Sequence, residues 1–200
     1  MVGRLTVLPQ ERLALLRPAL EMQLRETASL LEEEPFEDFF DSSMRALLVD
    51  GFQLAGADEG TVWLLDAARE FLVPRFNSGP KAESFVGSYR QSLRTGMISM
   101  VVATEQPICE NDMRANRQQD KTLDLRLRLE TSAMLAVPLY YVGELRGVVS
   151  CVQLQEPGDE SKARGFSMED LRRLQLTSGV MSRLIEHRLL TLCLGLEVLG

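Results

Sequence analysis

The segment from Arg94 to Leu154 decides the fold, and it contains two informative runs. The first, residues 94–112, reads RTGMISMVVATEQPICEND and predicts a short helix over 97–104 that leads into a strand over 107–110. The second, residues 132–154, reads SAMLAVPLYYVGELRGVVSCVQL. Two apolar runs joined by a short glycine-containing link predict an antiparallel hairpin.

The order of these motifs resembles the core of a GAF domain, a small-molecule sensor fold. That family carries G-x-x-G-x-v-a-x-t-g-x-P-v-x-i-x-D, followed by S-x-l-x-V-P-L-x-x-x-g-x-x-x-G-v-l. The positions that match are Gly96, Val102, Ala103, Thr104, Pro107, Ile108, Asp112, Ser132, Val137, Pro138, Leu139, Gly143, Gly147 and Val148. The resemblance covers roughly Phe36 to His187. It implies an α+β fold with about six antiparallel strands between helices, and a role in sensing far more often than in catalysis.

Flanking segments predict further elements. They are a helix over 36–55, strands over 61–66 and 71–76, a mixed stretch over 111–130 with helix favoured, and a closing helix of about thirty residues from 168. Residues 84–94 are ambiguous, although their apolar spacing would suit one face of a helix. Ser167 and Asp170 form a capping-box variant at the start of the closing helix.

The size of the chain fits one domain with additions at its ends. It has 200 residues, of which 45% are hydrophobic, enough to bury a proper core. We expect an N-terminal helical segment for dimerisation over 1–34 and a GAF-like domain over 35–187. Residues 188–200 would form the apolar end of the last helix, which serves as an interface or as the link to a further domain.

Charge and hydropathy exclude several classes of protein. The net charge of −7 argues against nucleic-acid binding and against adsorption to an anionic membrane. No apolar run is long enough to span a bilayer, and the N-terminus is a poor signal peptide. Three widely spaced cysteines suit a reducing compartment, so we expect a cytoplasmic protein.

Leucine stripes at both ends predict a homodimer through terminal helices. Pro18 interrupts the first stripe, so its first turns should be kinked or separate. The candidate interface residues are Leu16, Leu20, Leu24, Leu31, Met181, Ile185, Leu189 and Leu192. The alternative is that the last helix packs back on its own domain. An output domain or signalling partner is a further expectation.

Catalysis is not expected. His187, the one histidine, offers no acid–base pair, and we expect neither a metal nor a cofactor. Free methionine-R-sulfoxide reductases are GAF-like enzymes whose reactive residues lie at the Gly-rich helix start and in the loop before the V-P-L strand. Here Cys109 and Cys151 fall in predicted strands and Cys193 in the last helix, which is typical of buried, inert thiols.

A ligand would lie between the sheet and the segment from Arg94 to Met134. The candidate ligand-binding residues are Arg75, Arg94, Met97, Met100, Asn111, Met113 and Met134. The methionines could line an adaptable pocket, or they could fill a core that holds no ligand. Arg75 and Arg94, with Gly96 at a helix start, leave cyclic-nucleotide binding open as a further alternative.

The sequence therefore predicts a non-catalytic sensory or regulatory module that binds a small molecule or a partner and signals through dimeric terminal helices. The competing hypothesis is an assembly module whose pocket has degenerated. Cyclic-nucleotide binding and methionine sulfoxide reduction rank below both.

Overall fold

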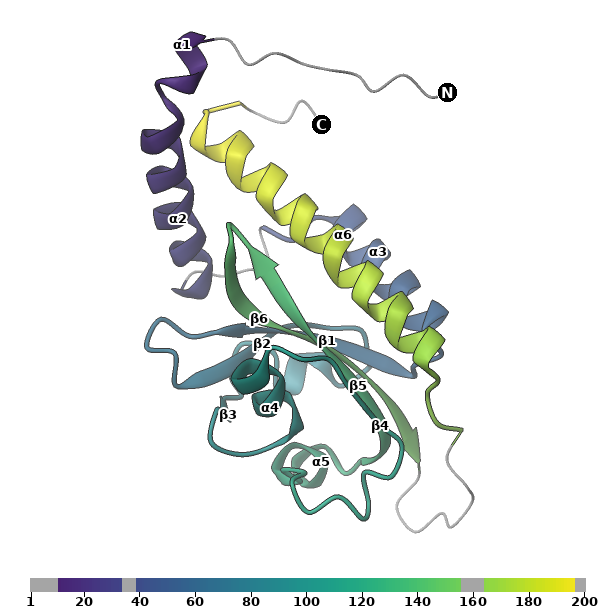
Figure 1. Ribbon diagram of the computed structural model, residues 1–200. Coiled ribbons are helices and arrows are strands. Elements are labelled where there is room, and N and C mark those ends of the chain that lie inside the picture. The colour runs from purple at the N-terminus through teal and green to yellow at the C-terminus, as the bar shows by residue number, and fades with distance from the viewer. Residues whose placement is uncertain (1–10, 34–38, 156–163, 197–200) are drawn as a thin grey trace, which may run out of the picture.

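One six-stranded antiparallel sheet forms the centre of the computed structural model, which describes residues 11–33, 39–155 and 164–196 (Figure 1). Its strand order is β3-β2-β1-β6-β5-β4. The strands are β1 (Glu59–Leu65), β2 (Phe71–Asn77), β3 (Gln91–Ser92), β4 (Ile108–Glu110), β5 (Glu130–Tyr141) and β6 (Glu144–Gln155). The predicted α+β class with about six antiparallel strands is confirmed.

Helices cover both faces of this sheet. They are α1 (Glu11–Ala14), α2 (Arg17–Glu33), α3 (Ser42–Leu54), the 3₁₀ turn η1 (Ala82–Ser84), α4 (Met97–Thr104), α5 (Thr122–Leu127) and α6 (Met168–Cys193). Figure 1 shows α3 and α6 on one face and α4 and α5 on the other, with α2 standing beside the C-terminal end of α6. None of the described helices combines the length and apolarity needed to cross a bilayer.

The predicted β5–β6 hairpin is present, and its turn consists of Val142 and Gly143, whereas the sequence predicts Glu144 in the turn as well; Glu144 is the first residue of β6. Val142 and Gly143 both have positive φ, 54° and 74°, which is the requirement of a type I′ turn. A β-branched residue in this region is strained. The Val142 N–H donates to Glu186 Oε1 of α6 over 3.0 Å, so the turn is held against the last helix.

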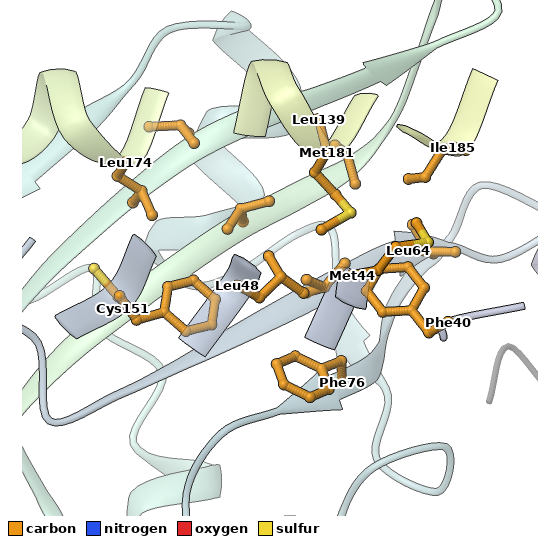
Figure 2. Packing of buried hydrophobic residues seen from close by; sticks show 14 of the residues in the cluster. Phe40, Met44, Leu48, Leu64, Phe76, Leu139, Cys151, Leu174, Met181 and Ile185 are labelled. Carbon is orange, nitrogen blue, oxygen red and sulfur yellow. The ribbon is translucent and has the colours of Figure 1, made fainter. Parts of the chain in front are cut away.

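The larger core lies between the sheet, α3 and α6. Figure 2 shows Met44 and Leu48 of α3 packed with Leu174, Met181 and Ile185 of α6, and all five are buried. Because side chains alternate along a strand, β1 sends Val62 and Leu64 into this core and the residues between them to the opposite face.

Cap chemistry sets where the helices begin. At α6 the Asp170 N–H donates to Ser167 Oγ over 3.2 Å, and the Ser167 N–H donates to Asp170 Oδ2 over 2.9 Å, which completes a capping box. The prediction of a helix from residue 36 needs correction, because α3 begins at Ser42. Asp41 accepts the Met44 N–H over 2.9 Å and so caps the helix there. Residues 36–38 lie outside the described part.

Three other segments refine the sequence prediction. Residues 84–94 contain the end of η1, turns and the two-residue strand β3 rather than a helix, and Gly87 there has φ of 73°. Within residues 111–130 only α5 is helical, and it ends where Arg128 adopts φ of 51°. The N-terminal stripe is split into α1 and α2, and Pro18 lies in the first turn of α2, where its missing N–H costs no helical bond.

Candidate functional site

A cavity of about 90 Å³ lies between the second face of the sheet and the segment that carries α4 and α5. Trp63 of β1, Met134 of β5 and Ser150 of β6 form its floor. Its apolar lining is completed by side chains from the covering segment, namely Phe85, Met97, Ile98, Met113, Leu123 and Leu127. The cavity therefore lies between the sheet and the segment from Arg94 to Met134, where the sequence predicts that a ligand would bind.

Trp63 is held rigidly in the cavity floor. It is 5% exposed, and its indole Nε1–H donates to Ser150 Oγ over 2.9 Å. The Tyr89 ring packs edge-on against it, with 6.3 Å between centroids. Because the indole donor is already satisfied, the ring offers the cavity an aromatic surface and no further hydrogen bond.

Asp124 is a half-buried carboxylate in the cavity wall. Its oxygens accept the Thr131 N–H and the Thr131 hydroxyl, each over 3.0 Å, and the Gln119 Nε2–H over 3.1 Å. Burial raises the pKa of Asp124, and the hydrogen bonds from Thr131 oppose that shift. The carboxylate thus ties α5 to β5 at the edge of the cavity.

Asp120 is more exposed than Asp124, and its pKa is shifted in the opposite direction. It accepts hydrogen bonds from Gln91 Nε2 over 3.1 Å, from Thr95 Oγ1 over 3.2 Å and from the Thr122 N–H over 3.0 Å. These hydrogen bonds, with Thr122 the largest contributor, lower the pKa of Asp120. Asp120 is therefore ionised over the whole neutral range.

Glu59 begins β1 and contributes the third carboxylate of the cavity. It is 8% exposed, and burial raises its pKa while a hydrogen bond from Asn77 opposes the shift. Its carboxylate lies so close to Gly79 that any side chain at position 79 would overlap it. Within the described part of the chain no lysine, arginine or histidine lines the cavity, and no ion pair joins Glu59, Asp120 or Asp124.

Replacing the buried charge should stabilise the fold. Because burial raises the pKa of Glu59, keeping it ionised costs folding free energy above the raised pKa, and that cost disappears below its ordinary value of 4.5. We expect Glu59→Gln to raise the melting temperature at neutral pH and to leave it unchanged at acidic pH. Thermal unfolding followed over a pH series, with the exposed Glu26→Gln as control, tests this. A lower melting temperature for Glu59→Gln at neutral pH would contradict it.

An open groove adjoins the cavity on its solvent side. It has a volume of about 690 Å³, and Gly96, Gln119 and Asp120 line both spaces. Its remaining lining includes three exposed cations, namely Arg94, Arg117 and Lys121. The acidic cavity thus opens beside a basic rim.

The structure brings together only part of the predicted ligand site. Three of the predicted residues line the cavity, namely Met97, Met113 and Met134. Two line the outer groove, Arg94 and Met100. The remaining two line neither space: Arg75 lies on β2, and Asn111 instead binds the Phe166 backbone, with its Nδ2 donating over 2.9 Å.

Sequence reasoning missed the cavity's polar side chains and its aromatic floor. Glu59, Asp120 and Asp124 come from separate segments, and each has the ordinary appearance of a surface charge in the sequence. The available signal was the alternation of β1, which places Trp63 on the face opposite Val62 and Leu64.

The cysteines of the sheet lie on the face away from the cavity. Cys109 and Cys151 flank Leu135 in the strand register, and all three belong to the α3–α6 side. Burial raises the pKa of both thiols, that of Cys151 to about 12. Cys193 lies in α6 beside Thr27, with 3.3 Å between Sγ and Oγ1. In the described residues no histidine, cysteine and carboxylate cluster forms a metal site.

The predicted interface residues also divide into two groups. Met181, Ile185 and Leu189 are fully buried in the chain's own core, so the expectation that they face a second copy needs correction. Leu31 is also part of that core. The others keep exposed surface to differing extents: Leu16 is 58% and Leu192 57% exposed, and Leu20 and Leu24 are partly buried.

An antiparallel sheet with a helical layer on one face and a helical excursion over a cavity on the other defines a class of small α+β domains. The chain belongs to the GAF domain family, whose model matches residues 33–186. No curated protein matches it.

Solved structures share the fold. The GAF domain of a phosphoenolpyruvate-protein phosphotransferase from Coxiella burnetii is 20% identical with a TM-score of 0.60, over 88% of this chain and 96% of that one. The corresponding Acinetobacter domain is 18% identical with a TM-score of 0.57, over 88% and 97%. A type II free methionine-R-sulfoxide reductase from Thermoplasma acidophilum is 20% identical with a TM-score of 0.57, over 75% and 94%. At these identities the likeness concerns the fold alone.

Proposed function

We propose that this chain is a non-catalytic sensory or regulatory module that binds a small molecule in the cavity beneath the sheet. The observation that carries the proposal is the cavity itself, where an aromatic floor and apolar walls meet buried polar groups. Ligand sites are concave and mostly apolar, with a few convergent polar groups, and this combination is present here.

The position of the cavity suits a signalling role. Thr131 and Met134 of β5 line it, whereas Leu135 on the same strand packs against the α6 side. Further along β5, the Pro138 carbonyl accepts the Ser178 hydroxyl of α6 over 3.0 Å. A ligand that shifted β5 would therefore act directly on the last helix, and through it on a partner.

The partner that we propose for α6 is a second copy of this chain. Leu176, Val180 and Leu184 recur every four residues and keep 69%, 39% and 38% of their surface exposed. Leu192 continues the same row. A stripe of this kind suits an equivalent helix related by a two-fold axis.

Filling the cavity should abolish ligand binding and leave the fold intact. Met134 lines the cavity, so the larger indole of Met134→Trp would occupy the space. We expect native mass spectra of protein purified from its own host to show a retained small molecule in the wild type and none in Met134→Trp. The matched control is Met168→Trp, at an exposed position on α6. Equal retention by Met134→Trp would place the site elsewhere, and an empty wild type would favour the assembly module.

Thiol chemistry should be absent, because none of the described residues that line the cavity is a cysteine. The similarity to the Thermoplasma enzyme makes the reductase the activity to test. We expect the purified protein, supplied with a dithiol reductant, not to reduce free methionine-R-sulfoxide above the background rate. The pKa of Cys109 is raised, so little of its thiol is in the reactive thiolate form at neutral pH. Turnover that is lost in Cys109→Ser would contradict this expectation.

A further inference from the structure

The charge balance of the cavity is one-sided. Glu59, Asp120 and Asp124 all line it, and none of the described lining residues is basic, although Lys81 attracts Glu59 and Lys121 attracts Asp124 from outside the lining. Carboxylates that share a low-dielectric space repel one another, and each loses hydration on burial. A bound cation would relieve both costs at once, whereas an anion would increase them.

Two of the lining groups can accept further hydrogen bonds. Glu59 is more than nine-tenths buried, and among the described residues Asn77 donates a hydrogen bond to its carboxylate, which has about four acceptor positions and so can accept further donors. Gln119 Oε1 is buried and has no hydrogen-bond partner within the described part of the chain. The Nε2 of the same amide donates to Asp124 and does not satisfy the oxygen. Buried acceptors without donors cost free energy, so the cavity is short of N–H or O–H groups.

The cavity floor favours positive charge in a different way. The Trp63 ring is fixed by its hydrogen bond to Ser150 and by the packing of Tyr89. An indole attracts ammonium and guanidinium groups more strongly than other aromatic side chains do, and the attraction increases when water is excluded. Trp63 and the carboxylates thus favour the same chemical class.

We propose that the cavity takes the cationic end of a small organic molecule, an ammonium or guanidinium group that donates to Glu59 and Gln119 beside Trp63. This inference rests on the proposed function, because it names the ligand class of that same site. An ammonium supplies three donors and no acceptor, which matches the Glu59 carboxylate and the unpartnered Gln119 Oε1.

The volume limits how much of the ligand lies inside. The cavity of about 90 Å³ is smaller than the roughly 150 Å³ that holds benzene in an apolar protein cavity. A head group with a short alkyl stem fills it. Any larger remainder would pass Gly96 and Gln119, which line both spaces, and lie in the outer groove.

Trp63 makes the test direct, because it is the single tryptophan of the chain and lies in the cavity. Isobutylammonium, isobutanol and isobutyrate form a probe series of similar shape and different charge. We expect isobutylammonium at millimolar concentration and neutral pH to change Trp63 fluorescence saturably, and the other two probes to have no such effect. Calorimetry on the same samples provides the affinities.

The Glu59→Gln variant then tests whether the Glu59 carboxylate binds the cationic group. We expect this isosteric change to weaken isobutylammonium binding about ten- to a hundredfold, as for loss of a charge-assisted hydrogen bond. The exposed Glu26→Gln should bind as the wild type does. Equal affinity for isobutanol, unchanged affinity in Glu59→Gln, or no response to isobutylammonium would each overturn the inference. If Glu59→Gln does not fold, the probe series on the wild type still decides.

The two proposals fail differently. Binding of isobutanol or isobutyrate that Met134→Trp abolishes would overturn the cationic class and leave the site in place. A host ligand that Met134→Trp retains would overturn the site itself.

Discussion

Gly147→Ala is expected to be the most damaging single substitution in the sheet. Gly147 lies in β6 and pairs with Leu64 of β1, and a Cβ at this position would come within 1.9 Å of the Trp63 carbonyl oxygen. That neighbour is backbone in a central strand, so no side-chain rotation relieves the overlap. The loss should exceed the roughly 1–3 kcal/mol that overpacking a core usually costs, and we expect little soluble protein.

Gly179→Ala is the matched control for this substitution. Gly179 lies on the exposed side of α6, and a Cβ added there would meet no atom within 4 Å. Alanine within a helix is about 0.5–1 kcal/mol more favourable than glycine, so this variant should be slightly more stable than the wild type. The soluble yield of both variants, and urea unfolding of the protein that is recovered, measure the contrast. Similar stabilities for the two would show that β6 adapts to a side chain at position 147.

The elements that the sequence predicts best are those whose signals are local. The helix over 97–104 and the hairpin around Gly143 depend on apolar spacing and on the turn, and both appear as predicted. The capping box at Ser167 likewise needs no tertiary information. Residues 84–94 show the limit of this reasoning. Their apolar residues are spaced as on a helix, yet Phe85 and Tyr89 reach the core from a succession of turns.

The sequence predicts the position of the candidate site and only part of its chemistry. Family resemblance places the ligand under the segment that ends at Met134, and the three cavity methionines follow from that. The acidic wall depends on β1, α5 and the turn before α5 meeting in space, so no local pattern marks Glu59, Asp120 and Asp124 as a group. The sequence on its own suggests that Arg75 and Arg94 would bind an anionic ligand. The cavity itself is lined by carboxylates and therefore carries negative charge.

The last helix shows why an apolar stripe does not by itself identify an interface. The sequence predicts Leu189 and Ile185 on the dimer surface, yet both lie in the domain core. A helix of 26 residues has room for two apolar faces. The alternative that α6 packs on its own domain therefore holds for one face, while Leu176, Val180 and Leu184 remain exposed on another.

Substitutions on these two faces of α6 should have separable effects. Met181 is fully buried, so Met181→Ala should lower the free energy of unfolding by about 2–5 kcal/mol, as large-to-small core changes do. Leu184 is 38% exposed, so Leu184→Glu should cost the isolated domain little. In a dimer built on the exposed stripe, however, each glutamate would be buried against apolar surface, and the dimer should dissociate.

Light scattering with urea unfolding distinguishes the two outcomes. We expect wild-type protein to be dimeric at micromolar concentration, Leu184→Glu to be a folded monomer, and Met181→Ala to remain dimeric while it unfolds at lower urea. Glu26→Gln, on the exposed side of α2, serves as the reference for a neutral surface change. A clean wild-type monomer, or a Leu184→Glu variant with the mass of a dimer, would exclude the α6 stripe as the contact between copies. In that case the path from the cavity through β5 to α6 would have to act on a different partner.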